Sequence, residues 1–222
     1  MTTRVLIINN DSFQLAALGA ALRLHGVDVI GEAKSFTLAH NLFTSLSPDA
    51  VIIDIAQDGK GAMEFARAVR ILKADLGIVM TSDCPDLRLL GISENDVPEG
   101  IQIIYKKAFT DLASLGDSIQ FSISALAGKE KMKWIDPQGT LAPLTRAGIV
   151  RDLTDIQIET LRLIAKGLSN AEIGRIRFVS EKSVEQMVSR VALHLHLNAD
   201  RTKNTRVLLA GEYYGWMNAR AS

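Results

Sequence analysis

The first half of the chain alternates short apolar runs with segments of helical period, and this pattern constrains the fold more than any other feature. Short continuous apolar runs bounded by turn signals are typical of strands that are buried on both faces. The strand-like runs are Val5–Ile8, Val27–Ile30, Ala50–Ile55, Gly77–Met80 and Ile101–Tyr105. The helical segments are residues 12–25, 35–46, 61–73 and 110–127. Strands that alternate with helices favour a doubly wound α/β fold, here with five parallel strands.

The segment between the last two strands departs from this alternation. Asp86–Leu90 could form a helical turn or two, but Gly91 and Pro98 break any longer helix. We therefore expect a poorly formed helix at this place in the sheet.

The chain then changes character twice. Residues 128–152 combine Gly, Pro and Lys in a way that fits neither period, which predicts a linker between a domain at 1–127 and another at 153–222. The charge differs between the parts. Residues 1–128 carry 10 Lys and Arg against 15 Asp and Glu, whereas residues 151–222 carry 11 against 8. The small basic excess at the rear is compatible with nucleic acid binding and does not decide it.

The rear domain reads as a set of short capped helices. Thr154 with Gln157, and Ser169 with Glu172, have the spacing of capping boxes at helix starts. Phe178-Val179 predicts a turn, and Ser180 can cap a further helix. That helix places Val184, Val188, Val191 and Leu195 on its inner face. Two short helices joined by a tight turn predict a helix-turn-helix, whose second helix, beginning at Ser180, is the recognition helix.

The outer face of the helix after Ser180 is polar, as a helix that enters the major groove requires. Its predicted DNA contacts are Lys182, Ser183, Glu185, Gln186, Ser189 and Arg190. These side chains can reach phosphates or base edges. Glu185 would be repelled by phosphates, although a carboxylate can accept from cytosine; it could instead pair with a neighbouring Arg or Lys on a solvated face.

The residues of the rear domain resemble a known family. The matching positions are Leu153-Thr154, Leu161, Leu163-Ile164-Ala165, Gly167-Leu168-Ser169-Asn170, Glu172-Ile173, Val179-Ser180-Glu181-Lys182-Ser183-Val184, Arg190-Val191, Leu195 and Arg201-Thr202. This run resembles the LuxR-type helix-turn-helix, and the front half is similar to a flavodoxin-like response-regulator receiver. The whole chain thus resembles a NarL/FixJ-class response regulator. The resemblance implies groove contact by Glu185, Gln186 and Ser189, with a Lys common in the family where this chain has Glu185.

The receiver resemblance assigns a phosphate-accepting role to Asp54. It matches Thr81 and Lys106 to the hydroxyl and the lysine that contact the phosphoryl group, with Lys107 as an alternative. The acidic pair that would hold magnesium is replaced by Asn9 and Asn10, and Asp11 follows one place later. Mg²⁺ prefers carboxylate oxygens, so we expect no bound cofactor and an atypical receiver that is not switched by magnesium-dependent phosphorylation of Asp54.

These features together predict a cytoplasmic, dimeric transcription regulator that binds promoter DNA and has no enzymatic activity. Cys84 is the only cysteine, so no intrachain disulfide is possible, and no apolar run is long enough for a membrane span. Expected dimer or partner contacts are the helix at 110–127, the broken segment after the fourth strand, and Leu208, Leu209 and Tyr213. A protein or small molecule could bind at the receiver.

Two alternatives stay open from the sequence. In the first, the chain is a conventional regulator that is activated by phosphorylation of Asp54. In the second, it is a protein-interaction module that has lost DNA binding, with Glu185 as the sign of that loss.

Overall fold

The computed structural model describes residues 2–56, 58–108, 112–125, 131–136, 146–197 and 202–217. The chain divides into two compact units. The first consists of residues 1–82 and 92–139, and the second of residues 83–91 and 140–222. The chain therefore passes between the units three times, because residues 83–91 belong to the second unit although they lie within the first half of the sequence.

The first unit is built on a parallel sheet. Its strands are β1 (Arg4–Ile8), β2 (Asp28–Ala33), β3 (Ala50–Asp54), β4 (Gly77–Ser82), β5 (Gln102–Tyr105) and β6 (Lys133–Ile135), in the order β2-β1-β3-β4-β5-β6. All five neighbouring pairs are parallel. The α/β fold with five strands predicted from the sequence is confirmed, and the structure adds a sixth.

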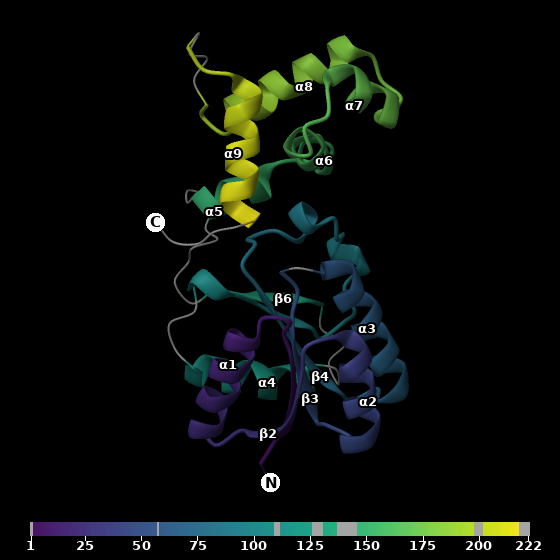
Figure 1. Ribbon diagram of the computed structural model, residues 1–222, viewed down its shortest axis with the longest axis vertical. Coiled ribbons are helices and arrows are strands. Elements are labelled where there is room, and N and C mark those ends of the chain that lie inside the picture. Colours follow the sequence, from purple (N-terminus) through teal and green to yellow (C-terminus); the bar gives the residue numbers. More distant parts are fainter. Residues whose placement is uncertain are drawn as a thin grey trace. The chain divides into compact units, whose positions relative to one another are not determined.

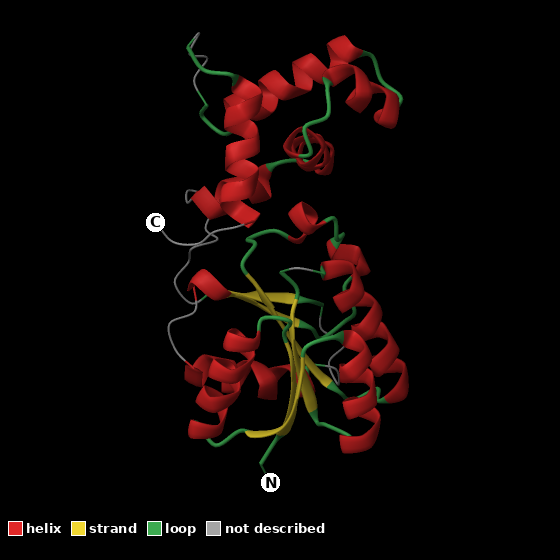
Figure 2. Cartoon of the chain, viewed as in Figure 1, coloured by secondary structure: helices red, strands yellow, loops and turns green. Residues whose placement is uncertain are grey.

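Helices cover both faces of this sheet (Figure 1; Figure 2). They are α1 (Ser12–Leu24), α2 (Phe36–Leu46), α3 (Gly59–Leu72) and α4 (Leu112–Ser124). Helices α1 and α4 lie on one face, and α2 and α3 lie on the other (Figure 1). Helix α1 begins where Asp11 accepts hydrogen bonds from the N–H groups of Phe13 and Gln14, and it ends before Gly26, whose φ of 78° suits glycine.

The topology also fixes where polar side chains gather. Strand β1 lies between β2 and β3 in the sheet. The connection from β1 to β2 and the connection from β2 to β3 therefore run on opposite faces of the sheet, and a crevice opens at the carboxyl ends of β1 and β3. Asn9 follows β1, and Asp54 ends β3 beside Thr81 of β4. The buried strand residues below this edge, such as Val5, Ile52 and Val79, form the core.

The stretch predicted as a linker contains regular structure. Strand β6 pairs with β5, placing Trp134 opposite Ile103, and helix α5 (Arg146–Ile149) continues into a 3-10 turn at Val150–Asp152. Residues 128–130 and 137–145 of that stretch lie outside the described residues. Strand β6 is three residues long and follows Lys131 and Met132. A strand this short shows no periodicity in the sequence.

The second unit contains four longer helices: α6 (Asp155–Ala165), α7 (Asn170–Arg177), α8 (Glu181–His194) and α9 (Thr205–Met217). The predicted capping box at Thr154 and Gln157 is present in full. The second predicted box is half formed. Ser169 accepts from the Glu172 N–H at 3.2 Å, but the Glu172 carboxylate pairs with Arg175 at 2.6 Å instead of returning to the helix start.

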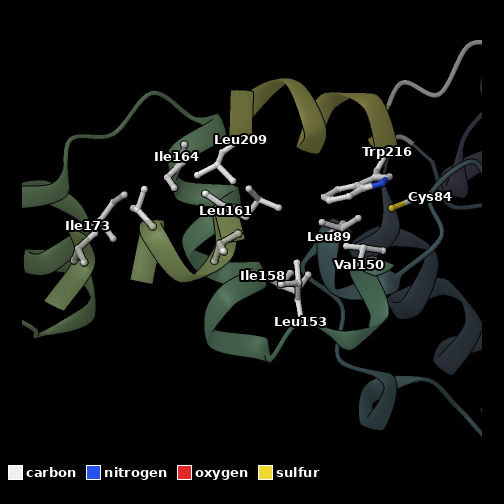
Figure 3. Close-up of a cluster of buried hydrophobic side chains, with 14 residues drawn as sticks. Cys84, Leu89, Val150, Leu153, Ile158, Leu161, Ile164, Ile173, Leu209 and Trp216 are labelled. Carbon is white, nitrogen blue, oxygen red and sulfur yellow. The ribbon is translucent and has the colours of Figure 1, made fainter. Parts of the chain in front are cut away.

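The core of the second unit includes part of the weak segment after the fourth strand. Residues 87–90 form a 3-10 turn instead of a helix, as the breaks in the sequence suggested. Cys84 and Leu89 are buried in one apolar cluster with Val150, Leu161 and Trp216 (Figure 3). The remaining buried members of the cluster are Leu153, Ile158, Ile164, Ile173, Val184, Val188, Val191, Ala192 and Leu209.

Among the described residues, no helix combines the length and the apolar character that crossing a membrane requires.

Candidate functional site

A polar cluster occupies the carboxyl edge of the sheet, centred on the Asp54 carboxylate. Its Oδ1 accepts from the Ala56 backbone N–H at 2.8 Å, and its Oδ2 accepts from the Asn9 amide at 3.1 Å. The Lys106 ammonium forms an ion pair with the same Oδ2. Only 8% of the Asp54 side chain is exposed. Each carboxylate oxygen is therefore bonded within the protein itself.

Gln14 closes this cluster from the first turn of α1. Its Oε1 accepts from Lys106 Nζ at 3.2 Å and from the Asn9 amide at 3.4 Å. Gln14 is not among the site residues predicted from the sequence. Its position one turn after Asn9, at the start of a helix that packs on the sheet, is the signal that could have found it.

The other predicted receiver residues lie around the cluster with different roles. Thr81 is mostly buried, and its carbonyl accepts from the Ile55 N–H at 3.0 Å. Asp11 caps α1, and hydrogen bonds from the Gln14 backbone N–H, followed by the Phe13 N–H, lower the pKa of its carboxyl. Asn10 is exposed, as is Lys107.

The polar groups of this cluster are engaged with one another and with the start of α1. The Asn9 amide nitrogen points at Asp54, while its Oδ1 accepts from the Asp11 backbone N–H at 2.8 Å. Both Asp11 oxygens accept hydrogen bonds around the start of α1. Mg²⁺ needs several oxygen ligands, and Lys106 occupies the carboxylate that would supply one. Within the described residues no group of three His, Cys, Asp or Glu side chains could hold a metal.

The second unit forms a helix-turn-helix from α7 and α8. Helix α7 ends at Phe178, which adopts the left-handed conformation with φ of 55°, and Ser180 caps α8. Gly174 permits this tight turn, because a Cβ there would lie 2.7 Å from the Val179 carbonyl oxygen. Arg177 holds α7 against α6 by donating to the Thr160 hydroxyl at 2.8 Å and pairing with Glu159.

Helix α8 has the two faces that the sequence predicts. Val184, Val188 and Val191 are buried in the cluster of the second unit. The six predicted contact residues, Lys182, Ser183, Glu185, Gln186, Ser189 and Arg190, are all exposed. Phe178 lies in the turn, as the sequence predicts, and its side chain is 94% exposed.

The predicted contact residues on the exposed face of α8 fall into two groups, those whose side chains already form hydrogen bonds and those whose side chains do not. The Ser183 and Ser180 hydroxyls are 2.8 Å apart, and the Ser189 hydroxyl donates to the Glu185 carbonyl at 3.0 Å. Lys182, Gln186 and Arg190 have no recorded side-chain partner in the part of the chain that the structure describes, and Glu185 has no ion pair there.

Two of the expected dimer contacts are instead part of the second unit's interior. Leu209 is fully buried, and Tyr213 packs against the same cluster while its hydroxyl donates to the Leu89 carbonyl at 3.2 Å. The helical phase of α9 turns these side chains inward, whereas Val207 is 67% exposed.

These observations define a class: a parallel α/β domain of receiver topology joined to a helical domain that contains a helix-turn-helix. Comparisons with known proteins agree. Residues 151–202 match the family model described as bacterial regulatory proteins, luxR family. The chain is 28% identical to the transcriptional regulatory protein LiaR of Bacillus subtilis over 208 residues, covering 90% of this chain and 93% of LiaR. It is 26% identical over 214 residues to the response regulator VraR of Staphylococcus aureus, covering 91% and 94% of the two chains.

Solved structures show the same fold. A structure of the response regulator RcsB in complex with DNA superposes with a TM-score of 0.55 at 19% identity, covering 97% of this chain and 99% of that one. A structure of two RcsB dimers on two parallel DNAs gives the same TM-score and identity and covers both chains in full. Over about nine tenths of its length the chain is therefore similar to a named response regulator, and residues 151–202 match the luxR family model. LiaR is named as a transcriptional regulatory protein.

Proposed function

We propose that the protein is a cytoplasmic transcription regulator that binds promoter DNA as a dimer through the exposed face of α8. The observation that carries this proposal is the division of α8 into a buried valine face and an exposed polar face, directly after a tight turn. A helix held by its apolar side can lie in the major groove and present its polar side to the bases.

The exposed side chains differ in the roles they can take. Lys182 lies in the first turn of α8, and Arg190 lies two turns further, so both can neutralise phosphates on the DNA backbone. Gln186 lies between them and carries the amide that pairs with adenine in the major groove. The Ser183 and Ser189 hydroxyls already bond within the helix, so they contribute less to sequence readout.

Glu185 sets the specificity in this proposal. Without an ion partner in the described structure, its carboxylate faces solvent and can accept from cytosine N4. The Glu185→Lys variant tests this directly. Restored binding in the variant with none in the wild type would instead support a module that has lost DNA binding.

DNA binding can be measured without knowledge of the operator. Genomic fragments enriched on the full-length protein supply a duplex for fluorescence anisotropy across a salt series. Lys182→Ala should lower the magnitude of the salt slope by about 1 per protomer, and so by about 2 for a dimer that loses two phosphate contacts. Lys60→Ala, an exposed lysine on α3 of the first unit, is the matched control and should leave the slope unchanged. Failure of the wild type to enrich any fragment would contradict the proposal.

Dimerisation follows from the way helix-turn-helix proteins reach two half-sites. RcsB, with the same fold, is described as dimers on DNA. Sedimentation of the protein on the enriched duplex gives the stoichiometry, and one protomer per duplex would contradict this part of the proposal.

The receiver in this proposal is not switched by magnesium-dependent phosphorylation. Its support is the cluster in which Lys106 and Asn9 bond to the Asp54 carboxylate, together with the finding that no group of three possible metal ligands is present among the described residues. The test is incubation with acetyl phosphate and Mg²⁺ followed by intact mass, with Asp54→Ala as control. A gain of one phosphoryl group that the control lacks would favour the conventional, phosphorylation-activated alternative.

A groove beside the cluster offers a different input. It has a volume of about 370 Å³, and its walls are mostly apolar, formed by Phe13, Ala17, Leu18, Ala21, Ile104 and Leu115. Asn9, Gln14, Asp54, Thr81 and Lys106 form its polar end. Since Asp54 already balances the charge of Lys106, the groove suits a neutral small molecule with an apolar body and a hydrogen-bonding end.

The neutral fluorophore N-phenylnaphthylamine probes this groove. Its fluorescence should rise with the wild type and fail to rise with Ala17→Trp, which fills the groove. Ala16→Trp is the matched control, because Ala16 is exposed on the same helix and does not line the groove. Equal fluorescence with all three proteins would contradict a ligand site here.

A further inference from the structure

Residues 83–91 are held in the second unit by polar contacts, most of which are made by Arg88. The Arg88 guanidinium donates three hydrogen bonds to the Asp86 carboxylate, the shortest from Nη2 to Oδ2 at 2.7 Å. Its Nη1 donates to the Leu153 carbonyl at 2.6 Å and to Asp155 Oδ1 at 2.9 Å, and its Nη2 donates to the Arg151 carbonyl at 3.1 Å. A guanidinium placed on the last carbonyls of the α5 and 3-10 turn stabilises that helix end.

Apolar contacts hold the same segment. Leu89 and Cys84 are 1% and 2% exposed within the cluster that also contains Trp216 of α9 (Figure 3). The Tyr213 hydroxyl donates to the Leu89 carbonyl. The segment is therefore an integral part of the core on which α6, α8 and α9 pack.

Docking of the segment leaves the proposed DNA face open. Its recorded partners within the described residues belong to α5 with its 3-10 turn, to α6 and to α9. The α8 residues that share its cluster are the inner valines, such as Val184 and Val188. A docked segment thus supports α8 from its inner side and does not compete with DNA.

The segment also continues directly from the receiver cluster. Thr81 pairs in register with Asp54, Ser82 ends β4, and Asp83 begins the segment. A displacement at the end of β4 therefore reaches Cys84 within three residues of chain.

We propose that residues 83–91 are a regulatory coupling segment: their docking in the second unit stabilises the DNA-binding form of α8, and their release lowers DNA affinity. This inference rests on the proposed DNA binding. Coupling between two events is reciprocal, so DNA must favour the docked segment by the factor by which docking favours DNA.

Cys84 reports docking without any added label, because it is the only cysteine in the chain. Its thiol donates to the Asp86 carbonyl at 3.2 Å, and burial raises its pKa to about 12. The thiolate is the reactive form, so the docked segment should react slowly with dithionitrobenzoate at about pH 8. Release exposes the thiol and restores an ordinary rate.

The experiment measures this rate and DNA affinity on full-length proteins. Arg88→Ala should raise the rate by about tenfold and weaken binding of the enriched duplex by a similar factor. Arg67→Ala is the matched control, since Arg67 donates to the Asp96 carbonyl inside the first unit, and it should change neither value. In the wild type, the duplex should slow the Cys84 reaction.

A second variant distinguishes release of the segment from unfolding of the second unit. Tyr213→Phe removes only the hydroxyl that bonds Leu89, so it should raise the rate less than Arg88→Ala while the helical content stays unchanged. Asp54→Ala, which alters the residue paired with Thr81, should also change the Cys84 rate. An unchanged rate would overturn the link to the receiver.

The other outcomes are equally decisive. A Cys84 rate that DNA does not alter, or an Arg88→Ala protein that releases Cys84 and binds DNA normally, would overturn the coupling. If the wild type binds no duplex, the proposed function fails, whereas the rates of Arg88→Ala and Arg67→Ala still report whether Arg88 holds the segment.

Discussion

Arg88 and Asp155 lie 67 residues apart in the sequence, and their side chains meet at 2.9 Å at the start of α6. The same guanidinium binds Asp86, whose side chain is only 4% exposed, whereas Asp155 is 87% exposed. The two ion pairs of Arg88 therefore differ in how much the protein loses in stability when each is broken. The buried one leaves an uncompensated charge when it is broken, and the exposed one is screened by water.

This difference predicts unequal costs for two alanine substitutions. Arg88→Ala should lower the free energy of unfolding of the second unit by about 3 kcal/mol, because it leaves the Asp86 carboxylate unpaired. Asp155→Ala should cost less than about 1 kcal/mol. Urea unfolding of the full chain, followed by Trp216 fluorescence against a Trp134→Phe background, measures both. Equal costs would contradict this ranking.

Two glycines in the second unit should respond in opposite ways to alanine. Gly174→Ala places a Cβ against the Val179 carbonyl and should destabilise the unit by about 1–3 kcal/mol and weaken DNA binding. Gly211→Ala meets no atom within 4 Å on α9 and should stabilise the unit by about 0.5–1 kcal/mol. Thermal unfolding compares the two, and a stable Gly174→Ala protein would show that the turn can open without loss.

The Asp11 cap predicts a defined acid dependence. Hydrogen bonds from the start of α1 lower its pKa below the usual 3.8, so its stabilising contribution is complete above that value. The contribution is lost as the pH falls through the lower pKa of the folded state. Asp11→Asn keeps a capping oxygen and should remove this part of the pH dependence. Urea midpoints of both proteins between about pH 5 and pH 2 provide the measurement, and parallel curves would argue against the cap.

Because the chain passes between the two units three times, proteolytic cleavage at one site should leave the fragments associated. A protease site inserted after Gly139 should yield two fragments on denaturing gels that migrate together under native conditions. The larger fragment still carries residues 83–91, which pack in the second unit. Leu89→Asp places a charge in that cluster and should let the fragments separate. Separation of the fragments without this substitution would contradict the assignment of the segment.

The sequence predicts the first unit well where burial imposes a pattern. Parallel strands covered on both faces are continuous apolar runs, and β1 and β3 were recognisable for that reason. Strand β6 is too short to show a pattern, and it follows a charged and polar stretch. The three-residue pairing with β5 creates it, and such pairing is a tertiary effect.

The sequence predicts which residues belong to the candidate sites better than it predicts their contacts. Strand ends brought Asn9, Asp54 and Lys106 to one edge, because parallel strands align their carboxyl ends. The valine spacing predicts which face of α8 is exposed. The sequence contains no sign that Leu89 packs in the second unit, since a buried leucine looks the same in either core. The sequence likewise does not reveal the hydrogen bonds that the Ser183 and Ser189 hydroxyls form.

Residues 83–91 have a consequence for how such regulators can exchange parts. A single crossover between the two units would bring a new helical domain without the segment that completes its core, leaving Arg88 and Leu89 facing foreign partners. Grafting this helical domain onto another receiver requires two transplanted pieces. Over evolutionary time, the residues of this short stretch should change together with those at the start of α6 and along α9, and independently of their own sequence neighbours in the sheet.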